Sequence, residues 1–254
     1  MNSYVHNLNR LEFMITLACT GRCKHCSEGD HTNAGGHIDG SAAVEMVRKA
    51  ARNYDIKSLM TFGGEPLLYP DAVYEIHAAA RDMGIPKRQL ITNGFFNRDK
   101  GKIKEVAGKL VDSGVNDICL SVDAFHQETI PLEPVLIFAR EVMAKGNSKL
   151  RAHPAWLVSA EAENPYNEKT REILKEFQAI GVEASDGNII FPSGNALKYL
   201  REYFDLSVPQ VSPYAVDPKD IRAICVDPNG NVLGGNIYQT DILELLAHYE
   251  PAKN

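Results

Sequence analysis

The sequence predicts an α/β protein built on a partial (β/α)6 barrel of the TIM type, followed by a short C-terminal extension. Strand-like apolar runs alternate with helix-like runs six times between about residue 10 and residue 204, as in a parallel sheet with crossover helices. Six such units are fewer than the eight that close a full barrel. The length of 254 residues and the 44% hydrophobic content are those of a chain that buries a sizeable core.

Each predicted element has a local signal. Short apolar runs indicate the strands, and amphipathic runs, four of which end at glycine, indicate the helices. Asp39 or Ser41 can cap the first helix, whereas Pro154 and Gly187 weaken the last two strands. The strands are expected at 11–17, 58–62, 88–92, 117–122, 150–158 and 182–191, and the helices at 42–54, 71–83, 99–113, 134–145, 168–180 and 195–204.

A proline-rich stretch containing Pro209, Pro213 and Pro218 predicts a linker after the barrel. We therefore expect two parts, a barrel at 1–204 and an extension at 205–254. Within the extension, Asn229-Gly230 predicts a hairpin turn, and 240–248 predicts a final helix.

Composition and charge narrow the classes of partner. A net charge of -6 gives no basic footprint for nucleic acid or for an anionic membrane surface. The N-terminus lacks a basic segment followed by an apolar one, and no apolar run is long enough to span a membrane, which predicts a cytoplasmic protein. Three of the five cysteines lie within eight residues, so metal binding in a reducing compartment is favoured over disulfides.

The chemistry-bearing residues follow the ends of the predicted strands. Cys19-x3-Cys23-x2-Cys26 comes after the first strand and offers three thiolates, the usual ligands of an iron–sulfur cluster. Later strands end in further polar or glycine-rich segments. These segments are Gly63-Gly64-Glu65-Pro66, Asn93, Ser121 with Asp123, and His126 in the following loop. Because strand carboxyl ends meet at one rim, we expect these residues to converge there.

The arrangement CTGRCKHC, followed by a strand that ends in GGEP, resembles the radical S-adenosylmethionine (SAM) superfamily. The resemblance implies that Cys19, Cys23 and Cys26 bind three irons of a [4Fe-4S] cluster whose fourth iron is chelated by SAM. It implies that His25 lies beside the adenine and that the GGEP turn meets the SAM ammonium. It places Ser121 or Asp123 at the SAM ribose or carboxylate, with Asn93 next to them.

The same resemblance implies the reaction. The cluster cleaves SAM reductively, and the 5'-deoxyadenosyl radical abstracts hydrogen from a substrate. An external one-electron reductant such as flavodoxin or ferredoxin is then required. His126 is a candidate for substrate binding or proton transfer.

The end of the chain is similar to peptide-modifying members with a SPASM or twitch extension. The similarity lies in Phe191-Pro192-Ser193-Gly194-Asn195-Ala196 and in Ile224 to Val232. Those extensions bind auxiliary clusters through several cysteines, whereas this one contains only Cys225, so we expect no auxiliary cluster. A peptide substrate is favoured on this ground, with a small metabolite as the alternative.

Other hypotheses stay open from the sequence. A glycyl-radical activating enzyme uses the same cluster, but the extension argues against it. A zinc or iron–sulfur regulator could complete its site with His25, His31 or His37. Cys119 is either a hydrogen donor to a substrate radical or a packing residue, and packing is the favoured interpretation.

Overall fold

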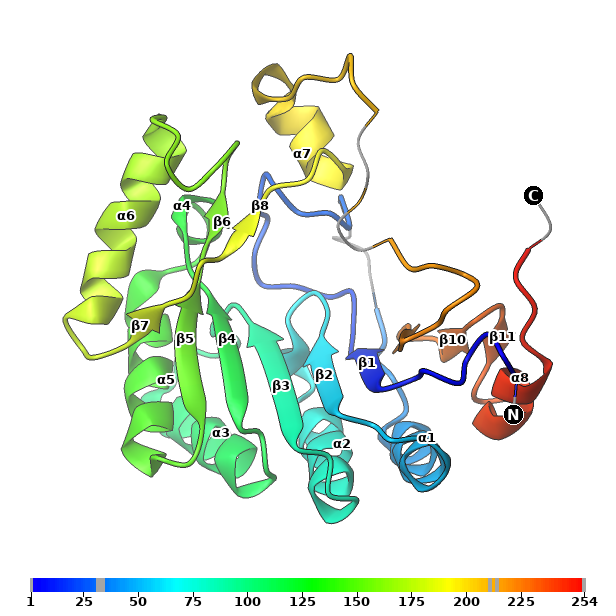
Figure 1. Cartoon of the computed structure of the whole chain (residues 1–254). Coiled ribbons are helices and arrows are strands. Elements are labelled where there is room, and N and C mark those ends of the chain that lie inside the picture. Colours follow the sequence, from blue (N-terminus) through cyan, green and yellow to red (C-terminus); the bar gives the residue numbers. More distant parts are fainter. Residues whose placement is uncertain (1, 31–34, 210–211, 213–214, 253–254) are drawn as a thin grey trace.

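A seven-stranded parallel sheet forms the centre of the protein (Figure 1). The computed structural model describes residues 2–30, 35–209, 212 and 215–252. The strands are β1 (Arg10–Met14), β2 (Ser58–Phe62), β3 (Lys87–Thr92), β4 (Asp117–Ser121), β5 (Lys149–His153), β7 (Glu183–Ala184) and β9 (Ala223–Val226). Their order is β7-β5-β4-β3-β2-β1-β9, and β7 and β9 do not pair with each other. The sheet is therefore open, and the predicted partial barrel is confirmed.

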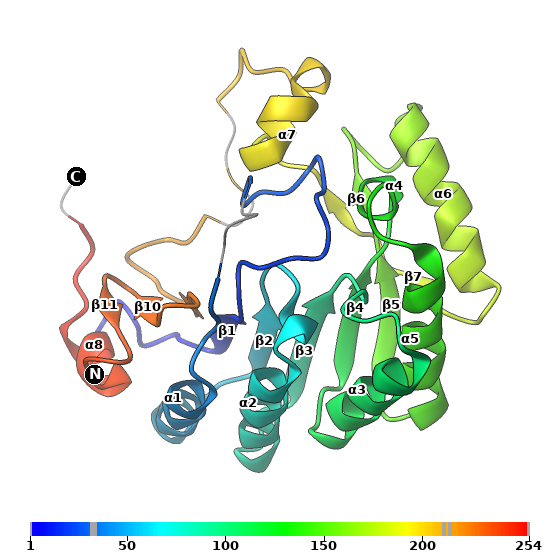
Figure 2. The same cartoon turned by 180° about the vertical axis from the view of Figure 1, so that it is seen from behind.

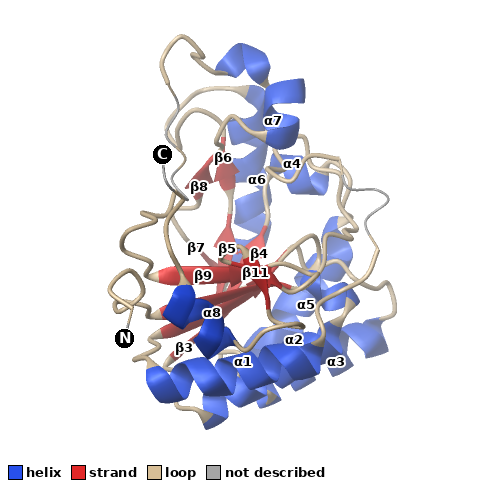
Figure 3. Ribbon diagram, turned by 90° about the vertical axis from the view of Figure 1, so that its right-hand side faces the viewer, coloured by secondary structure: helices blue, strands red, loops and turns tan. Residues whose placement is uncertain are grey.

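Helices cover one face of this sheet (Figures 2 and 3). They are α1 (Gly40–Asn53), α2 (Pro70–Asp82), α3 (Lys100–Asp112), α5 (Leu132–Lys145) and α6 (Pro165–Gln178). Of the two candidate caps, Asp39 is the one that caps α1, because its carboxylate accepts from Ala42 N at 3.0 Å. None of the helices described is long and apolar enough to cross a membrane.

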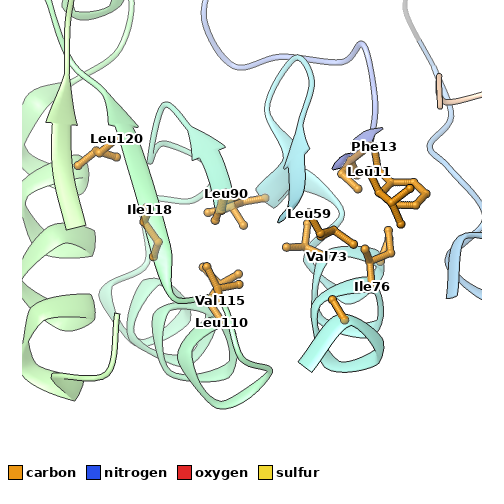
Figure 4. Close-up of a cluster of buried hydrophobic side chains, with 14 of the residues drawn as sticks. Leu11, Phe13, Leu59, Val73, Ile76, Leu90, Leu110, Val115, Ile118 and Leu120 are labelled. Atoms are coloured by element: carbon orange, nitrogen blue, oxygen red, sulfur yellow. The ribbon is translucent and has the colours of Figure 1, made fainter. Parts of the chain in front are cut away.

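The main core lies between the sheet and these helices (Figure 4). Alternate strand residues such as Ile118 and Leu120 point into it and are fully buried. On the helical side they meet residues such as Val73, Ile76 and Leu110. Because side chains alternate along a strand, the intervening residues face the opposite side of the sheet, the interior of the partial barrel.

The fifth and sixth predicted strands are each broken in two, so their expected continuous ranges are wrong. Pro154 separates β5 from β6 (Ala155–Trp156), because proline has no N–H with which to continue the ladder. Gly187 separates β7 from β8 (Asn188–Ile189) with φ at +76°. A side chain on Gly187 would overlap Pro154 O. The two strands thus bend where their backbones meet, and β6 and β8 form a separate parallel pair.

The C-terminal extension contributes a strand to the main sheet. β9 pairs in parallel with β1, with Ile224 opposite Leu11. Gly230 N donates to Asp227 O at 3.0 Å, so a turn is present at Asn229-Gly230. The hairpin predicted around that turn is nevertheless wrong, because the antiparallel pair is β10 with β11. These strands are β10 (Asn231–Val232) and β11 (Gly235–Asn236), and the final helix is α8 (Ile242–His248).

Several short elements lie beyond the carboxyl ends of the strands, above the sheet in Figure 1. They are η1 (Pro66–Leu68), α4 (Ala124–Gln127), α7 (Gly194–Tyr199) and η2 (Arg201–Tyr203). Residues 15–30, which follow β1, cross the same end of the sheet. This end is where the predicted site residues meet.

Candidate active site

The cysteine loop follows β1 and is fixed from both sides. None of its three cysteines is in a disulfide, and Cys23 is buried while Cys19 and Cys26 are half-buried. On one side, Lys24 forms an ion pair with Glu128 at 2.6 Å, just after α4. On the other side, the start of α7 hydrogen-bonds the loop backbone. The loop is therefore held in place by segments about 100 and 170 residues away along the chain.

The environment of the thiols suits a metal cluster. Burial raises the pKa of Cys19 to about 11, raises the pKa of Cys26, and holds the pKa of Cys23 well above its usual range. Neighbouring thiols further disfavour the ionisation of Cys19 and of Cys23. Bound iron would supply the positive charge that holds all three as thiolates. The donor set, three soft sulfur ligands on one loop, fits the three protein-bound irons of a [4Fe-4S] cluster.

The GGEP turn packs directly against the segment that leads into this loop. Gly64 N donates to Thr16 O at 2.7 Å, and Glu65 N donates to Ala18 O at 2.8 Å. A side chain on Gly64 would overlap Ala18 O, so this close approach requires glycine. Gly63 has φ at +150°, and a side chain there would overlap Thr16 O. The two glycines therefore position the chain that enters the cysteine loop.

Glu65 is fully buried, and the protein itself uses its carboxylate. One oxygen accepts from Leu67 N at 2.9 Å and from Thr92 Oγ1 at 2.7 Å, and the other accepts from Asn93 N at 2.8 Å. Burial raises the pKa of Glu65 to about 7, although these donors oppose the shift. The structure thus shows Glu65 tying η1 to the end of β3. Pro66 begins η1, where a missing N–H is tolerated.

Asn93 lies at the end of β3 and reaches the cysteine loop. Its Nδ2 donates to Cys19 Sγ at 3.6 Å and to Thr20 Oγ1 at 3.2 Å. Its Oδ1 accepts from Phe95 N at 2.8 Å, which fixes the orientation of the amide. Asn93 is therefore a direct neighbour of a predicted cluster ligand.

Asp123, which is buried, and His126, which is half-buried, form a pair at the start of α4. Asp123 accepts from Phe125 N at 2.9 Å and from His126 N at 3.0 Å, and it thereby caps α4. Its other oxygen binds His126 Nδ1 at 2.8 Å and Ala155 N at 3.0 Å. Burial alone would raise the pKa of Asp123, but the imidazole and the backbone donors hold it well below its usual range. The carboxylate fixes the imidazole, whose Nε2 is left for another partner.

His25 contacts both rings of this region, with ring centroids 4.9 Å from His126 and 5.1 Å from Phe125. Burial lowers the pKa of His25 to about 4, so the ring is neutral. Cys23, His25 and His126 place ligand atoms within 4.8 Å of one another. His37 instead binds Ile38 O through Nδ1 at 2.8 Å and does not join this group. His31, another candidate zinc ligand, lies outside the described residues.

Ser121 ends β4 and is half-buried on the interior face, with His153 as its register partner on β5. Most of the predicted site residues thus gather at the rim. Their contacts differ from the expected ones, because Glu65 and Asp123 already satisfy buried donors. The SAM-binding roles assigned to them stay predictions.

Sequence reasoning missed Asn195 and Gly194 as site residues. Asn195 N donates to Cys26 O at 2.9 Å, and Asn195 Nδ2 donates to Cys23 O at 3.2 Å. A side chain on Gly194 would overlap Ser27 O and lie 2.5 Å from Cys26 O. The start of α7 thus clamps the cysteine loop. The signal was present in the Phe191 to Ala196 segment, which resembled a family segment but carried no assigned role.

An open parallel barrel with three cysteine thiols, one buried and two half-buried, beyond the ends of its strands defines the class as an iron–sulfur enzyme of barrel type. Residues 13–206 match the family model of the Radical SAM superfamily, and the chain belongs to this superfamily. It is accordingly an enzyme with a [4Fe-4S] cluster and SAM as cofactors. Membership in this superfamily of enzymes also argues against the hypothesis that the protein is a non-catalytic regulator.

Curated relatives and solved structures agree with this assignment. A "Probable GTP 3',8-cyclase" of Saccharolobus islandicus is 32% identical over 126 residues, which cover 48% of this chain and 37% of the relative. One of Methanocaldococcus jannaschii is 27% identical over 127 residues, covering 50% and 40%. The matched region thus spans well under half the length of these relatives.

The fold is similar to that of Streptococcus suis SuiB bound to S-adenosylmethionine, with a TM-score of 0.63 at 14% identity, covering 96% of this chain and 66% of SuiB. It is also similar to anSMEcpe with bound AdoMet, with a TM-score of 0.59 at 13% identity, covering 94% and 80%. The likeness extends over nearly the whole chain, including most of the C-terminal extension.

Proposed function

We propose that Cys19, Cys23 and Cys26 hold the cluster and that the enzyme abstracts hydrogen from a peptide substrate. The single observation that carries the cluster assignment is the convergence of three thiols, outside any disulfide, on one clamped loop. When bound, the cluster and SAM supply a 5'-deoxyadenosyl radical, for which an outside one-electron reductant such as flavodoxin or ferredoxin is needed. A reducing, cytoplasmic setting suits these thiols.

The residues of this chain would position and shield that chemistry. The Gly63-Gly64 backbone approaches the loop closely and is available to the SAM methionine group. His25 offers a neutral ring for the adenine, and Ser121 offers a hydroxyl on the interior face. His126, held by Asp123, presents Nε2 at the rim for a substrate group or a proton.

A peptide substrate is supported by the shape of the barrel and by its structural neighbours. The interior face of the sheet carries no helix among the described residues (Figure 3). The edge strands β7 and β9 each pair with only one strand of the sheet. An extended chain can enter such a face. SuiB, in the structure bound to its precursor peptide SuiA, has a TM-score of 0.62 against this chain at 13% identity, covering 96% of it.

A small metabolite is the second candidate. The probable GTP 3',8-cyclases are more similar in sequence than the solved structures are, at 32% against 14% identity. Their similarity covers only about half of the chain. Comparing peptides with nucleotides as substrates in the same assay separates the two candidates.

The division of the chain also stays a proposal. We assign 1–204 to the barrel and 205–254 to an extension without auxiliary cluster ligands. Cys225 is the only cysteine of that extension, and it lies on β9 opposite Glu12. One thiol does not hold a cluster.

The test is anaerobic reconstitution with iron and sulfide, followed by dithionite, SAM and chromatography for 5'-deoxyadenosine. We expect product from the wild type and loss of both cluster and product in Cys23→Ala. Cys225→Ser is the matched control, because it removes a thiol outside the loop, and it should retain both. Binding of zinc in place of a cluster, or product formation by Cys23→Ala, would contradict the proposal.

A further inference from the structure

The interior face of the sheet carries polar and charged side chains directly beneath the site. Asp117 and Cys119 on β4 lie beside Arg151 on β5, and Ser121 lies beside His153 one step nearer the rim. The same strands bury their alternate residues against the helices (Figure 4). This polarity is unusual for a parallel sheet, whose two faces are ordinarily apolar. It indicates that something polar occupies the face.

The two arginines on this face differ in how many of their donors are used. Arg10 is engaged along its whole guanidinium, with bonds to Glu12, Ser58, Met60 and Gln89. Arg151 uses only Nη2, which donates to Asp117 Oδ1 at 2.5 Å and to Cys119 Sγ at 3.6 Å. Its Nε is buried with no hydrogen-bond partner among the described residues. No described residue accepts from its Nη1 either. Three of the five donors of Arg151 are therefore unused.

The carboxylate beside Arg151 is shared. Asp117 also accepts from Gln89 Nε2 at 3.0 Å and forms an ion pair with Lys87 at 3.3 Å. Glu183, the register partner of Arg151 on β7, is exposed and forms no ion pair with it. On this face the strands carry one more cation than carboxylate, since Arg10, Lys87, Lys149 and Arg151 oppose Glu12, Asp117 and Glu183.

The unused donors lie at a depth that suits a substrate. Cys119, the register partner of Arg151, is four residues before Asp123 in the chain, which corresponds to roughly 13 Å at the usual rise of a strand. His153 lies on β5 one step nearer the rim than Arg151, with Nδ1 bound to Ser185 Oγ at 2.8 Å, and its Nε2 has no hydrogen-bond partner among the described residues. Burial, then the nearby Arg151, lowers the pKa of His153 and so favours its neutral ring. The side chain of Arg151 is a quarter exposed, so the interior can reach it.

We propose that Arg151, with His153 above it, binds a carboxylate or phosphate group of the substrate and so sets the position of the carbon nearer the rim. This inference rests on the proposed function and narrows its substrate to an anionic one. A guanidinium with free donors matches two-oxygen acceptors of either kind. In a peptide the group is an acidic side chain or the terminal carboxylate, and in a metabolite it is a carboxylate or phosphate.

The opposing possibility is that Arg151 only neutralises Asp117. A purely structural ion pair leaves no saturable site for a further anion. A measurement of anion binding at Arg151 itself separates the two possibilities. Such a measurement does not require the enzyme to turn over a substrate.

The experiment is an NMR titration of the anaerobic, cluster-loaded protein carrying ¹⁵N-labelled arginine. Arg151→Lys assigns the Nε–H signal of Arg151. Inorganic phosphate and acetate are the probes, and sodium chloride at equal ionic strength is the reference. We expect the Arg151 signal to shift saturably with at least one probe, and the probe that saturates first identifies the phosphate or carboxylate class. Arg140, which is exposed on α5, should respond only to ionic strength.

Two variants extend the test. Arg151→Gln should weaken the anion affinity about tenfold or more, and Arg140→Gln should leave it unchanged. If Arg151→Gln does not fold, Arg151→Lys keeps the charge beside Asp117 but loses the forked donors, and the wild-type titration stands without either variant. A wild-type Arg151 signal that moves no more than that of Arg140 overturns the inference.

The same samples are assayed for 5'-deoxyadenosine, so the two proposals can fail separately. SAM cleavage without anion binding at Arg151 overturns the inference and leaves the proposed function intact. Anion binding without SAM cleavage supports the anion site and overturns the proposed function.

Discussion

The side-chain amide of Asn93 donates to the sulfur of Cys19, with Nδ2 and Sγ 3.6 Å apart. The backbone N–H of the same residue donates to Glu65 Oε2 at 2.8 Å. Asn93 thereby connects the GGEP turn to a predicted cluster ligand. A hydrogen bond to a ligand sulfur stabilises the more negative, reduced state of a cluster. The residue is placed to adjust the reduction potential as well as the position of the loop.

Replacing Asn93 with alanine should therefore lower the reduction potential of the cluster. A hydrogen bond of about 1 kcal/mol corresponds to about 40 mV for a one-electron couple. The measurement is a redox titration followed by electron paramagnetic resonance. Asn97→Ala, in which an exposed asparagine of the same loop is changed, should leave the potential unchanged. Equal potentials in Asn93→Ala and wild type would show that the bond has no electronic effect.

Much of the site could be predicted from the sequence because each of its motifs lies within one short segment of the chain. The cysteine spacing and the GGEP turn lie within short segments, and glycines permit the close backbone approach that the structure shows at Gly64. The contacts of Asn93, Asp123 and Asn195 could not be predicted from the sequence. Each joins segments far apart in the chain, such as Asp123 with Ala155 N, and no local pattern encodes such pairs.

In the fold, too, local features could be predicted from the sequence and contacts between distant segments could not. The first four strands followed from local apolar runs and glycine-ended helices. The break of the fifth and sixth strands depends on Gly187 meeting Pro154 from another strand, which is a tertiary contact. The place of β9 beside β1 depends on pairing across some 210 residues, whereas its sequence alone fits a hairpin equally well.

The pairing of Asp123 with His126 should appear as a coupling energy in a double-mutant cycle of Asp123→Asn and His126→Ala. Asparagine retains an oxygen that can cap α4, so the cycle isolates the bond to the imidazole. We expect a coupling of about 1.5–3 kcal/mol in the free energy of unfolding, followed by the fluorescence of Trp156. The pKa of Asp123 is depressed, so its contribution persists above about pH 4 and is lost only as the pH falls further.

The comparison for this cycle is Asp99→Asn. Asp99 caps α3 by accepting from Lys102 N at 2.7 Å and is exposed, with no histidine bound to it. The Asp99→Asn substitution should lower the free energy of unfolding by less than about 0.5 kcal/mol. A coupling energy between Asp123 and His126 of less than about 0.5 kcal/mol would mean that the carboxylate serves only as a cap.

Burial of Glu65 should make stability depend on pH near neutrality. The pKa of Glu65 rises from 4.5 to about 7 on folding. The folded state thus binds the proton more tightly, and this contribution is present below about pH 4.5 and is lost as the pH rises through about 7. Glu65→Gln has no such proton. The wild-type free energy of unfolding minus that of the variant should fall by about 2–3 kcal/mol between about pH 5 and pH 8.

Urea unfolding at several pH values measures this difference. Glu163→Gln changes an exposed glutamate and should give a difference that is flat across the same range. A flat difference for Glu65→Gln as well would show that the three donors keep Glu65 ionised in the folded protein.

Gly194→Ala should release the cysteine loop, because the added methyl group would overlap Ser27 O and lie 2.5 Å from Cys26 O. Gly146→Ala is a matched control. Both glycines have positive φ, +49° and +73°, but nothing lies within 4 Å of a Cβ on Gly146. The control therefore measures the backbone cost alone, about 1 kcal/mol of unfolding free energy. Only Gly194→Ala adds a clash with the loop that carries the thiols.

Iron content per chain after reconstitution should fall in Gly194→Ala and stay at the wild-type level in Gly146→Ala. Equal iron content in the two variants would mean that α7 is not required to hold the cysteine loop.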